Sequence, residues 1–441
     1  MKEADIVVIG GNNAGHVAAE VARKYYKDAK IVLIRKEKVV LCPCGIPYIF
    51  GTLKSPEQAA YSDRYISEHN IDLIIDEVTS IDRDKRTITT LKGETIGYKK
   101  LVLATGSQAI VPPIPGVDLE NVFVAKKDID YLRGFLEALD KAKNVVTIGG
   151  GFIGVEFSDE FRKRGLDVTI IEMLPHCLQL VFDLEFCIMA ENKLRQRGIK
   201  LMTNTRAKAI IGERKVEGVE LADGEKIPAD IVLLGIGMRP NTELAQKAGL
   251  KIGETRAIWV DEYGRTSDED IFAVGDCAEK RSFFTGRPIP LGLASIATNE
   301  ARVAAANLFG IRRKNMGAVG AFSTIIGDSG MGKVGLSEKE ATDLGFEITT
   351  GETIISDKHP PAMPNSKEIS MKLVFEKASK RILGAQIFGG SSVGEIVNIL
   401  SVFIQKKMTA EEMALCQVGT HPAFTPAPPA YHFVTIAEEA A

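Results

Sequence analysis

Hydrophobic positions along the chain form short β-branched runs, each followed by a glycine turn and a stretch with helical spacing. The first example has a run at Ile6–Ile9, the turn Gly10–Gly15, an alanine-rich helical stretch to about Lys27, and a second run at Ile31–Ile34. Short apolar runs bounded by glycine are typical of buried parallel strands. The order strand, turn, helix, strand therefore predicts a βαβ unit.

The same pattern returns in the middle of the chain. Val145–Ile148 leads into the turn Gly149–Gly154, a helical stretch follows to about Arg164, and Asp167–Ile171 is the next strand. Further strands are predicted at 101–103, 231–234 and 271–274, and a helix at 294–308. Two such units predict an α/β fold with two Rossmann-like dinucleotide-binding domains.

From about Ala321 the pattern changes to alternating strands, such as Ile369–Phe375 and Ile382–Phe388, followed by a helical segment at Val393–Lys406. This mixture indicates a third domain of the α+β class. We expect the first dinucleotide-binding domain at 1–115 and again at 245–320, the second at 116–244, and the C-terminal domain at 321–441.

The second glycine turn carries the stronger nucleotide signal. Gly149 permits a tight turn, Gly151 lets backbone N–H groups approach a pyrophosphate, and Gly154 lets helix and strand pack closely. Glu172 lies 18 residues past Gly154, where a carboxylate accepts hydrogen bonds from ribose hydroxyls and repels a 2′-phosphate. No arginine follows it directly, which favours NADH over NADPH. A turn that binds nothing is the alternative, which the matching strand, helix and acid disfavour.

The first glycine turn is degenerate. Asn12 replaces its middle glycine, and Arg35 stands where a ribose-binding acid is expected, 20 residues past Gly15. Gly275–Asp276 at a strand end supports a nucleotide site, because this carboxylate can bond a sugar-alcohol chain. A helix N-cap is the alternative role for Asp276, and on the sequence alone it is the favoured one.

Candidate chemistry lies in the run Cys42-Pro43-Cys44-Gly45, which follows a strand-like stretch at 39–41. A cysteine near a helix start and a flavin can react as a thiolate. The alternative is that both cysteines are small buried hydrophobes. A disulfide across one residue would be strained, so Cys42 is expected to be a bystander. The other cysteines are expected to be structural: Cys177, Cys187, Cys277 and Cys416.

Composition narrows the class of protein. The 441 residues are 45% hydrophobic and 26% charged, which is ordinary for a globular protein. A net charge of −3 argues against a non-specific nucleic-acid binder, and six cysteines are too few for a disulfide scaffold. No apolar run reaches the length of a membrane-spanning helix. We therefore expect a cytoplasmic protein with no nucleic-acid, membrane or metal site.

Taken in order, these motifs resemble the pyridine nucleotide–disulfide oxidoreductases. The likeness is greatest to their single-cysteine branch, which includes NADH oxidase, NADH peroxidase and coenzyme A–disulfide reductase. The motifs that carry it are Gly10–Gly15, Cys44–Tyr48, Ala104–Ser107, Gly149–Glu156, Gly237 and Asp270–Ala278. The resemblance implies FAD on the first domain, NADH on the second and a homodimer formed through the C-terminal domain.

The resemblance also implies roles for single residues. Those implied to contact FAD are Gly10, Gly11, Asn12, Ala14, Gly15, Arg35, Thr105, Gly106, Asp276, Ala294 and Phe424. Those implied to contact NADH are Gly149, Gly151, Phe152, Gly154, Glu156, Glu172 and Gly237. Glu156 would hold the nicotinamide end, and Phe152 resembles an aromatic gate. Cys44 matches the redox cysteine. His421 resembles an acid–base histidine, with a helix-cap or interface role equally open.

Two departures from the family pattern bear on the substrate. Asn13 stands where oxidases and peroxidases of this branch carry a histidine, which disfavours a peroxidase. Coenzyme A–disulfide reductases carry basic residues early in the first helix. Here Glu20 and Val21 occupy that region, with Arg23 and Lys24 after them, so coenzyme A binding is only partly supported.

Three functions are consistent with these motifs. The first is an FAD-dependent oxidoreductase that passes electrons from NADH through flavin and Cys44 to a disulfide, persulfide or coenzyme A disulfide. The second is an NADH oxidase that uses O2 as the acceptor. The third is a non-catalytic redox sensor or electron-transfer partner.

Overall fold

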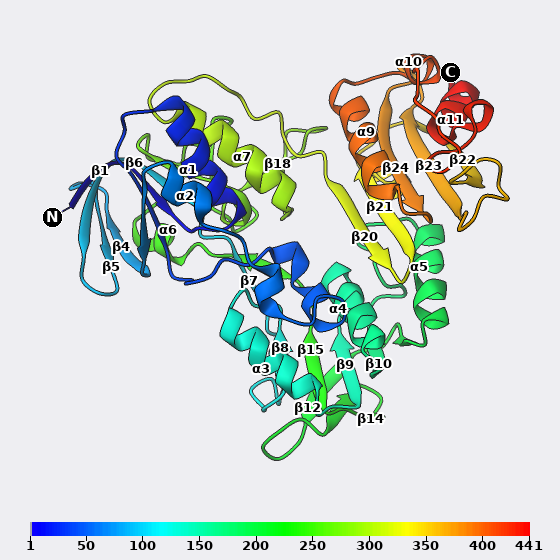
Figure 1. Ribbon diagram of the computed structural model, residues 1–441, viewed down its shortest axis with the longest axis horizontal. Coiled ribbons are helices and arrows are strands. Elements are labelled where there is room, and N and C mark those ends of the chain that lie inside the picture. Colours follow the sequence, from blue (N-terminus) through cyan, green and yellow to red (C-terminus); the bar gives the residue numbers. More distant parts are fainter. Residues whose placement is uncertain (1) are drawn as a thin grey trace. The chain divides into compact units, whose positions relative to one another are not determined.

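The computed structural model describes residues 2–441 (Figure 1). The chain divides into two compact units. The first unit comprises the chain up to Ile110 together with residues 125–137 and 237–318, and the second comprises residues 111–124, 138–236 and 319–441. In the residues that the structure describes, no helix is long and apolar enough to cross a membrane.

The first unit is built on a seven-stranded sheet with the order β3-β2-β1-β6-β5-β4, in which β17 also pairs with β6. Its strands are β1 (Lys2–Ile9), β2 (Ile31–Arg35), β3 (Ile71–Ile75), β4 (Val78–Asp82), β5 (Thr87–Thr90), β6 (Thr95–Leu103) and β17 (Ile271–Ala273). The strands β3, β2, β1, β6 and β17 run parallel. The apolar side chains of β1, β2, β6 and β17 are almost completely buried, which explains the unbroken β-branched runs in the sequence, whereas those of β3 are mostly only partly buried.

Helices α1 (Asn13–Tyr25) and α7 (Ala294–Asn307) lie side by side over this sheet (Figure 1). Small residues such as Ala18, Ala22, Ala301 and Ala304 bring the two helices close together. The shorter elements are α2 (Arg64–Glu68), α6 (Glu243–Lys247), β7 (Ser107–Ala109), β16 (Met238–Pro240), β18 (Lys280–Arg281), β19 (Pro288–Ile289) and the 3₁₀ helices η1 (Pro43–Gly45), η2 (Pro47–Phe50), η3 (Pro56–Ala59) and η4 (Gly275–Cys277). Helix α3 (Ile129–Leu139) runs across a boundary of the first unit's segments.

The second unit contains the other predicted βαβ pattern, in a five-stranded parallel sheet with the order β11-β10-β9-β15-β8. The elements around it are β8 (Val122–Val124), β9 (Asn144–Ile148), α4 (Phe152–Lys163), β10 (Asp167–Ile171), α5 (Leu184–Gln196), β11 (Lys200–Met202), β12 (Ala207–Ile211), β13 (Gly218–Leu221), β14 (Lys226–Pro228) and β15 (Ile231–Leu234). Strands β12, β13 and β14 form a separate antiparallel sheet.

The same unit also contains an antiparallel sheet with the order β20-β21-β24-β23-β22, against which α9 packs. Its elements are β20 (Ala321–Ile326), β21 (Ser329–Gly335), α8 (Glu338–Asp343), β22 (Ile348–Ser356), β23 (Glu368–Glu376), β24 (Ile382–Phe388), α9 (Val393–Gln405), α10 (Ala410–Ala414), η5 (Pro428–Ala430) and α11 (His432–Ala440). This arrangement is the predicted α+β C-terminal domain.

One predicted element is wrong. The stretch 39–41 forms no strand, and its only sheet-like contact among residues 2–441 is an isolated bridge between Leu41 and Ala60. The apolar residues Val40 and Leu41 are buried, as expected from the pattern. However, no strand lies beside this stretch to form a ladder of backbone hydrogen bonds with it.

Candidate functional site

The first glycine turn joins the end of β1 to the start of α1. Gly10 has φ +103°, and a Cβ there would lie 2.1 Å from the carbonyl oxygen of Ala104 at the end of β6. A Cβ at Gly15 would lie 1.7 Å from the carbonyl oxygen of Gly10. Glycine is therefore required for strand and helix to approach this closely. The first turn of α1 holds no acidic residue, so its positive end suits an anion such as a pyrophosphate.

Arg35, at the end of β2, is buried and lies over this turn. A Cβ at Gly11 would meet Arg35 Cδ at 2.5 Å. Its two terminal nitrogens donate to the carboxylate oxygens of Asp63 at 2.6 Å each, and further N–H groups donate to the carbonyl oxygens of Glu37 and Lys38. The guanidinium lowers the pKa of Asp63. No sequence motif indicated Asp63, because it is brought to Arg35 only by the tertiary fold.

Two further predicted FAD contacts lie at strand ends of the same unit. Asp276 accepts a hydrogen bond from the Ser107 hydroxyl at 2.7 Å. It lies within η4, whose N-cap is Val274, so the interpretation of Asp276 as a helix N-cap is wrong. Thr105 donates to the carbonyl oxygen of Asn241 at 2.8 Å, and Asn241 returns a bond to the Thr105 carbonyl. Asn241 was not among the predicted residues.

Four other predicted residues complete this end of the first unit. Ala294 is the first residue of α7, which has no acidic residue in its first turn. Gly106 has φ +69° and Gly237 has φ +112°, both in the left-handed region that favours glycine. Ala14 is packed beneath the Gly275 turn, since a Cβ at Gly275 would lie 2.9 Å from that of Ala14. These contacts draw the ends of β1, β6 and β17 and the start of α7 together, a cradle that fits a dinucleotide.

Cys44 lies in η1 and is exposed, while Cys42 is a partly buried free thiol. The side-chain amide of Asn12 donates to the carbonyl oxygen of Leu41 at 3.0 Å, which ties this segment to the first glycine turn. The η1 helix is a single turn, so it supplies little of the macrodipole that a longer helix would.

Tyr61 was not predicted, yet it lies beside both cysteines. Its hydroxyl is hydrogen-bonded to Cys42, and backbone bonds between Tyr61 and Val40 and between Cys42 and Ala59 hold the two segments together. Burial first, and then the bond to Cys42, raise the pKa of Tyr61. The Tyr61 hydroxyl therefore stays protonated near neutral pH beside the cysteine segment.

The cysteines elsewhere fit structural roles. Cys177, Cys187 and Cys277 are buried, and Cys416 is partly buried. Burial raises the pKa of Cys177 and of Cys187 to about 12, which leaves them as unreactive thiols near neutral pH.

The second glycine turn, between β9 and α4, repeats the geometry of the first. Gly149 has φ +109°, and a Cβ at Gly154 would lie 1.9 Å from its carbonyl oxygen. Within residues 2–441, no heavy atom lies within 4 Å of a Cβ built at Gly151, and no side chain caps α4. Open space above uncapped N–H groups fits a pyrophosphate.

Glu172, at the end of β10, is buried. Its carboxylate accepts hydrogen bonds from the backbone N–H of Gly150 at 2.6 Å and of Leu174 at 2.7 Å. The acid therefore helps to shape the glycine turn, in addition to the ribose contact that the sequence suggests.

Glu156 and Phe152 both contact strand β20 of the C-terminal domain. The Thr324 hydroxyl donates to Glu156 Oε1 at 2.7 Å, and the ring of Phe322 stacks on that of Phe152 at 5.5 Å between centroids. Burial raises the pKa of Glu156. Neither Thr324 nor Phe322 was predicted. Because side chains alternate along a strand, the sequence places Phe322 and Thr324 on the same face of β20. The sequence does not indicate that this face contacts α4.

His421 and Phe424 lie together in the C-terminal tail. Their rings are 4.8 Å apart, and the backbone N–H of Ala423 donates to His421 Nδ1 at 3.2 Å. Both side chains are exposed, Phe424 by 72%.

The basic residues near the end of α1 are engaged within the protein. Arg23 donates to five carbonyl oxygens, those of Tyr26, Lys27, Ala29, His69 and Asn70. Lys24 pairs with Glu20 at 2.7 Å. Arg23 is thus committed to the fold, whereas Lys24 is exposed and its pair with Glu20 is a surface ion pair.

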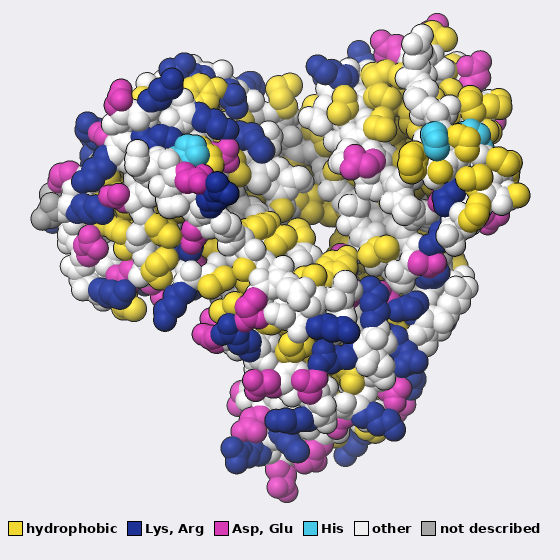
Figure 2. Space-filling view, viewed as in Figure 1, with side chains coloured by type: hydrophobic (Ala, Val, Ile, Leu, Met, Phe, Trp, Pro, Cys, Tyr) yellow, Lys and Arg dark blue, Asp and Glu magenta, His cyan; other side chains and the backbone are white. Residues whose placement is uncertain are grey.

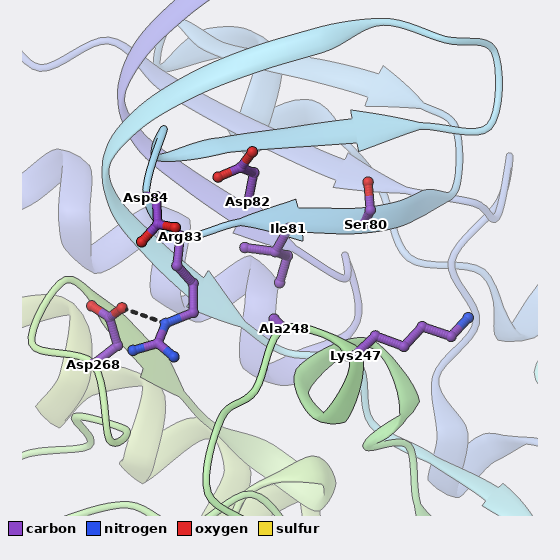
Figure 3. A pocket seen from close by; sticks show the side chains of 8 residues that line it. All are labelled: Ser80, Ile81, Asp82, Arg83, Asp84, Lys247, Ala248 and Asp268. Carbon is purple, nitrogen blue, oxygen red and sulfur yellow. Dashed lines mark hydrogen bonds and ion pairs between the residues drawn. The ribbon is translucent and has the colours of Figure 1, made fainter.

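An open hollow of about 650 Å³ lies elsewhere in the first unit (Figure 3). Across it, Arg83 reaches Asp268 with an N–O distance of 2.7 Å. The residues that line it are Ser80, Ile81, Asp82, Arg83, Asp84, Lys247, Ala248 and Asp268, none of them a predicted site residue.

Comparison with known proteins decides the family. The sequence model of the pyridine nucleotide-disulphide oxidoreductase family matches residues 4–301. The sequence model of the dimerisation domain of the same family matches residues 322–430. The chain belongs to the pyridine nucleotide-disulphide oxidoreductase family. The predicted family and fold class are thereby confirmed, as is the class of enzyme, a flavoprotein oxidoreductase with FAD and NAD(H) as cofactors.

Similar proteins in this family include two from archaea. The chain is 36% identical over 420 residues to an NADH oxidase of Methanocaldococcus jannaschii, covering 92% of each. It is 33% identical over 428 residues to an NAD(P)H coenzyme A polysulfide/persulfide reductase of Pyrococcus horikoshii, covering 96% of this chain and 95% of the relative.

Two similar solved structures are named for the same two kinds of activity, persulfide reduction and NADH oxidation. An NAD-dependent persulfide reductase from A. fulgidus has a TM-score of 0.92 and 33% identity, over 99% of this chain and 83% of that one. A water-forming NADH oxidase from Lactobacillus brevis, solved with NADH bound, has a TM-score of 0.90 and 27% identity, over 99% and 98%.

Proposed function

We propose that this enzyme is an NADH-dependent reductase that passes electrons through flavin and Cys44 to a sulfur substrate, such as a disulfide, a persulfide or a coenzyme A disulfide. The observation that carries the proposal is the exposed Cys44, on a segment that Asn12 ties to the first glycine turn. An accessible cysteine beside a flavin-binding turn is suited to sulfur exchange.

The two glycine turns divide the cofactors between them. We propose that the first, with Thr105, Asp276 and the start of α7, binds FAD, and that the second binds NADH. Glu172 would bond the adenosine ribose, Glu156 the nicotinamide end, and Phe152 would act as the movable ring over it. When bound, the flavin supplies the two-electron link between NADH and the cysteine.

Cys44 carries the sulfur chemistry. As a thiolate it attacks one sulfur of a substrate R–S–S–R′, forming a Cys44–S–S–R mixed disulfide and releasing R′S⁻, which takes up a proton. Two electrons then cleave the mixed disulfide, release RS⁻ and restore the thiolate. The hydroxyl of Tyr61 stays protonated near neutral pH and can donate a hydrogen bond to sulfur in the cysteine segment.

The names of two relatives support a sulfur acceptor, and one of them includes coenzyme A. The P. horikoshii relative is named an NAD(P)H coenzyme A polysulfide/persulfide reductase, and the A. fulgidus structure an NAD-dependent persulfide reductase. Of the basic residues of α1, Arg23 is held by backbone carbonyl oxygens, whereas Lys24 makes an exposed pair with Glu20 and can turn to a coenzyme A phosphate.

Oxygen is the second candidate acceptor. The relative from M. jannaschii is named an NADH oxidase, and so is the L. brevis structure. The two functions separate on one measurement: an oxidase consumes NADH in air without any sulfur substrate, whereas a sulfur reductase does not.

We also propose that the enzyme is a cytoplasmic homodimer. The matched dimerisation domain supports a dimer, and hydrophobic side chains gather on the surface over α9 and around α11 (Figure 2). Exposed large apolar residues of this domain are Leu344, Ile354, Ile399, Val402, Leu415 and Phe424. In a dimer, His421 and Phe424 would be covered, and His421 would serve as an acid–base group for the partner. Light scattering on the purified enzyme measures the mass.

Anaerobic titration with NADH tests the role of Cys44. Uptake of two NADH equivalents per FAD is expected of enzyme first treated with a disulfide, because the flavin and the Cys44 mixed disulfide each accept two electrons. Cys44→Ser should reduce uptake to one equivalent and abolish sulfur reduction. Cys42→Ser is the matched control, two residues away, and should retain both. One equivalent in the native enzyme would contradict the proposal and favour an oxidase or an electron-transfer protein.

A further inference from the structure

Strand β20 and helix α4 match one another at successive positions. Phe152, Glu156 and Asp159 lie on one face of α4, since they are four and three residues apart. Opposite them, Phe322 stacks on Phe152, and the Thr324 hydroxyl donates to Glu156. The contacts form a continuous line along both elements.

The line extends past the end of β20. The backbone N–H of Gly327 donates to Asp159 Oδ2 at 3.1 Å. Asp328 follows, paired with Lys193 of α5 at 2.5 Å. The register of β20 against α4 is therefore fixed on both sides of Thr324, which leaves its hydroxyl little freedom to choose another partner.

Thr324 is itself buried, and its backbone is paired with Met331 in the neighbouring strand β21. Ser323, the residue before it, is exposed, as expected for the opposite side of a strand. A buried hydroxyl on a rigid strand is a fixed donor, and a bond from it restricts the rotation of a long glutamate side chain.

We propose that Thr324 is a positioning residue for the nicotinamide site: it holds the Glu156 carboxylate in the orientation that binds NADH. The inference rests on the proposed function, which gives Glu156 its role, and adds that the C-terminal domain completes the NADH site of the domain before it. A carboxylate so held presents its second oxygen to N–H donors, such as those of a nicotinamide carboxamide.

The charge state of Glu156 follows from the same contacts. Burial and Glu160, on the same helix, raise the pKa of Glu156, while the Thr324 hydroxyl lowers it. Removing the hydroxyl should therefore raise the pKa of Glu156 further. If the ionised form binds the nucleotide, the acidic limb of binding moves to higher pH.

Isothermal titration of the oxidised, FAD-loaded enzyme with NAD+ tests the proposal without turnover. Thr324→Val keeps the shape of the side chain and removes the donor, so NAD+ affinity should fall about three- to tenfold, as for loss of an ordinary hydrogen bond. The acidic limb should move upward in pH. KM for NADH should rise more than kcat falls.

Thr324→Ser restores the hydroxyl and should return affinity and pH profile to within about twofold of the native values. Ser323→Ala, which removes a hydroxyl from the other face of the same strand, should change neither. If Thr324→Val does not fold, Thr324→Ala removes the same donor with less bulk. Equal losses in the serine and valine variants would overturn the proposal, because they would point to packing instead of the hydroxyl.

Glu156→Gln distinguishes failure of the positioning role of Thr324 from failure of the proposed nicotinamide role of Glu156. Native NAD+ binding in Glu156→Gln would remove the nicotinamide role of Glu156 and with it the role of Thr324. Weakened binding in Glu156→Gln with native binding in Thr324→Val would overturn the positioning role alone. If each variant alone weakens NAD+ binding, the double variant is informative. Thr324→Val should then lower NAD+ affinity by a smaller factor in the Glu156→Gln background than in the native enzyme.

Discussion

The two glycine turns of this enzyme have nearly the same backbone and end beside opposite charges. Gly10 and Gly149 have φ +103° and +109°, and in both turns the third glycine lies against the carbonyl of the first. At the end of the next strand, however, the first turn has Arg35 and the second has Glu172. Arg35 turns away to Asp63, while Glu172 accepts the Gly150 N–H.

This difference separates what the fold requires from what the ligand requires. Close approach of strand and helix is common to both turns, so it belongs to the fold. The charge at the strand end differs, so we expect it to act on the choice of nucleotide. Substitution of a close-approach glycine should therefore damage the turn that holds it, whichever turn that is, whereas substitution of the strand-end charge should change nucleotide binding with less effect on the fold.

The largest effect is expected at the first glycine of each turn. Gly10→Ala combines a left-handed φ with a Cβ 2.1 Å from a backbone oxygen, and should lower the free energy of unfolding by about 3 kcal/mol or more and release FAD. In Gly149→Ala the added Cβ lies 2.6 Å from the nearest backbone oxygen, so the free energy of unfolding should fall less, and the variant should retain FAD. Thermal unfolding and the FAD-to-protein ratio measure both. Equal FAD loss in the two variants would contradict the division of cofactors.

The next effect is at the ion pair of the first turn. Asp63→Asn leaves the buried Arg35 without its carboxylate, and should lower the free energy of unfolding by about 2 kcal/mol, since Asp63 itself is partly exposed. Glu20→Gln, which breaks the exposed pair with Lys24, is the control and should leave the free energy of unfolding nearly unchanged.

The same pair gives a pH dependence. Arg35 lowers the pKa of Asp63, so the pair contributes above the ordinary aspartate pKa of about 4. That contribution is lost as the pH falls through the lower pKa of the folded protein. The unfolding free energy of the native enzyme should therefore fall more steeply below about pH 4 than that of Asp63→Asn. Parallel acid profiles would show that the pair contributes nothing.

The second turn should respond in specificity. Glu172→Ala removes the acceptor for the Gly150 N–H and the negative charge that repels a 2′-phosphate, so NADH affinity should fall about tenfold, or about 1.4 kcal/mol. NADPH should lose much less. Glu172→Gln keeps the size and one acceptor but not the charge, and distinguishes the two contributions. Competitive binding of the two nucleotides measures the ratio, and an unchanged ratio would refute the role of the charge.

The smallest effect is expected when the first turn is made to resemble the second. Asn12→Gly supplies the missing middle glycine but removes the N-cap of α1 and the bond to Leu41. The free energy of unfolding should fall by only about 1 kcal/mol, because glycine is also accepted at a helix N-cap. Proteolysis near Cys42 should become faster, as its segment loses a tether. A gain in stability would show that the glycine pattern outweighs the tether.

The sequence predicted what is local in this molecule. The glycine turns, the strands β1, β9, β10 and β24 and the helices α1 and α7 depend on neighbouring residues, and their patterns could be read directly. Asp63 and Thr324 could not be found, because each acquires its partner only through the tertiary fold, 28 and 168 residues away in sequence. The strand predicted at 39–41 failed for the same reason, since apolar runs do not reveal whether a neighbouring strand exists.

The connectivity of the first sheet has a consequence for synthesis on the ribosome. Its strand β17 pairs with β6, Ile271 against Leu101, so that sheet stays incomplete until the chain has grown past residue 273. The parallel sheet of the second unit needs nothing beyond β15, which ends at Leu234. The nascent chain can thus complete its middle fold before the fold at its own N-terminus. The apolar edge of β6 must then wait, exposed to chaperones, for a strand that is translated later.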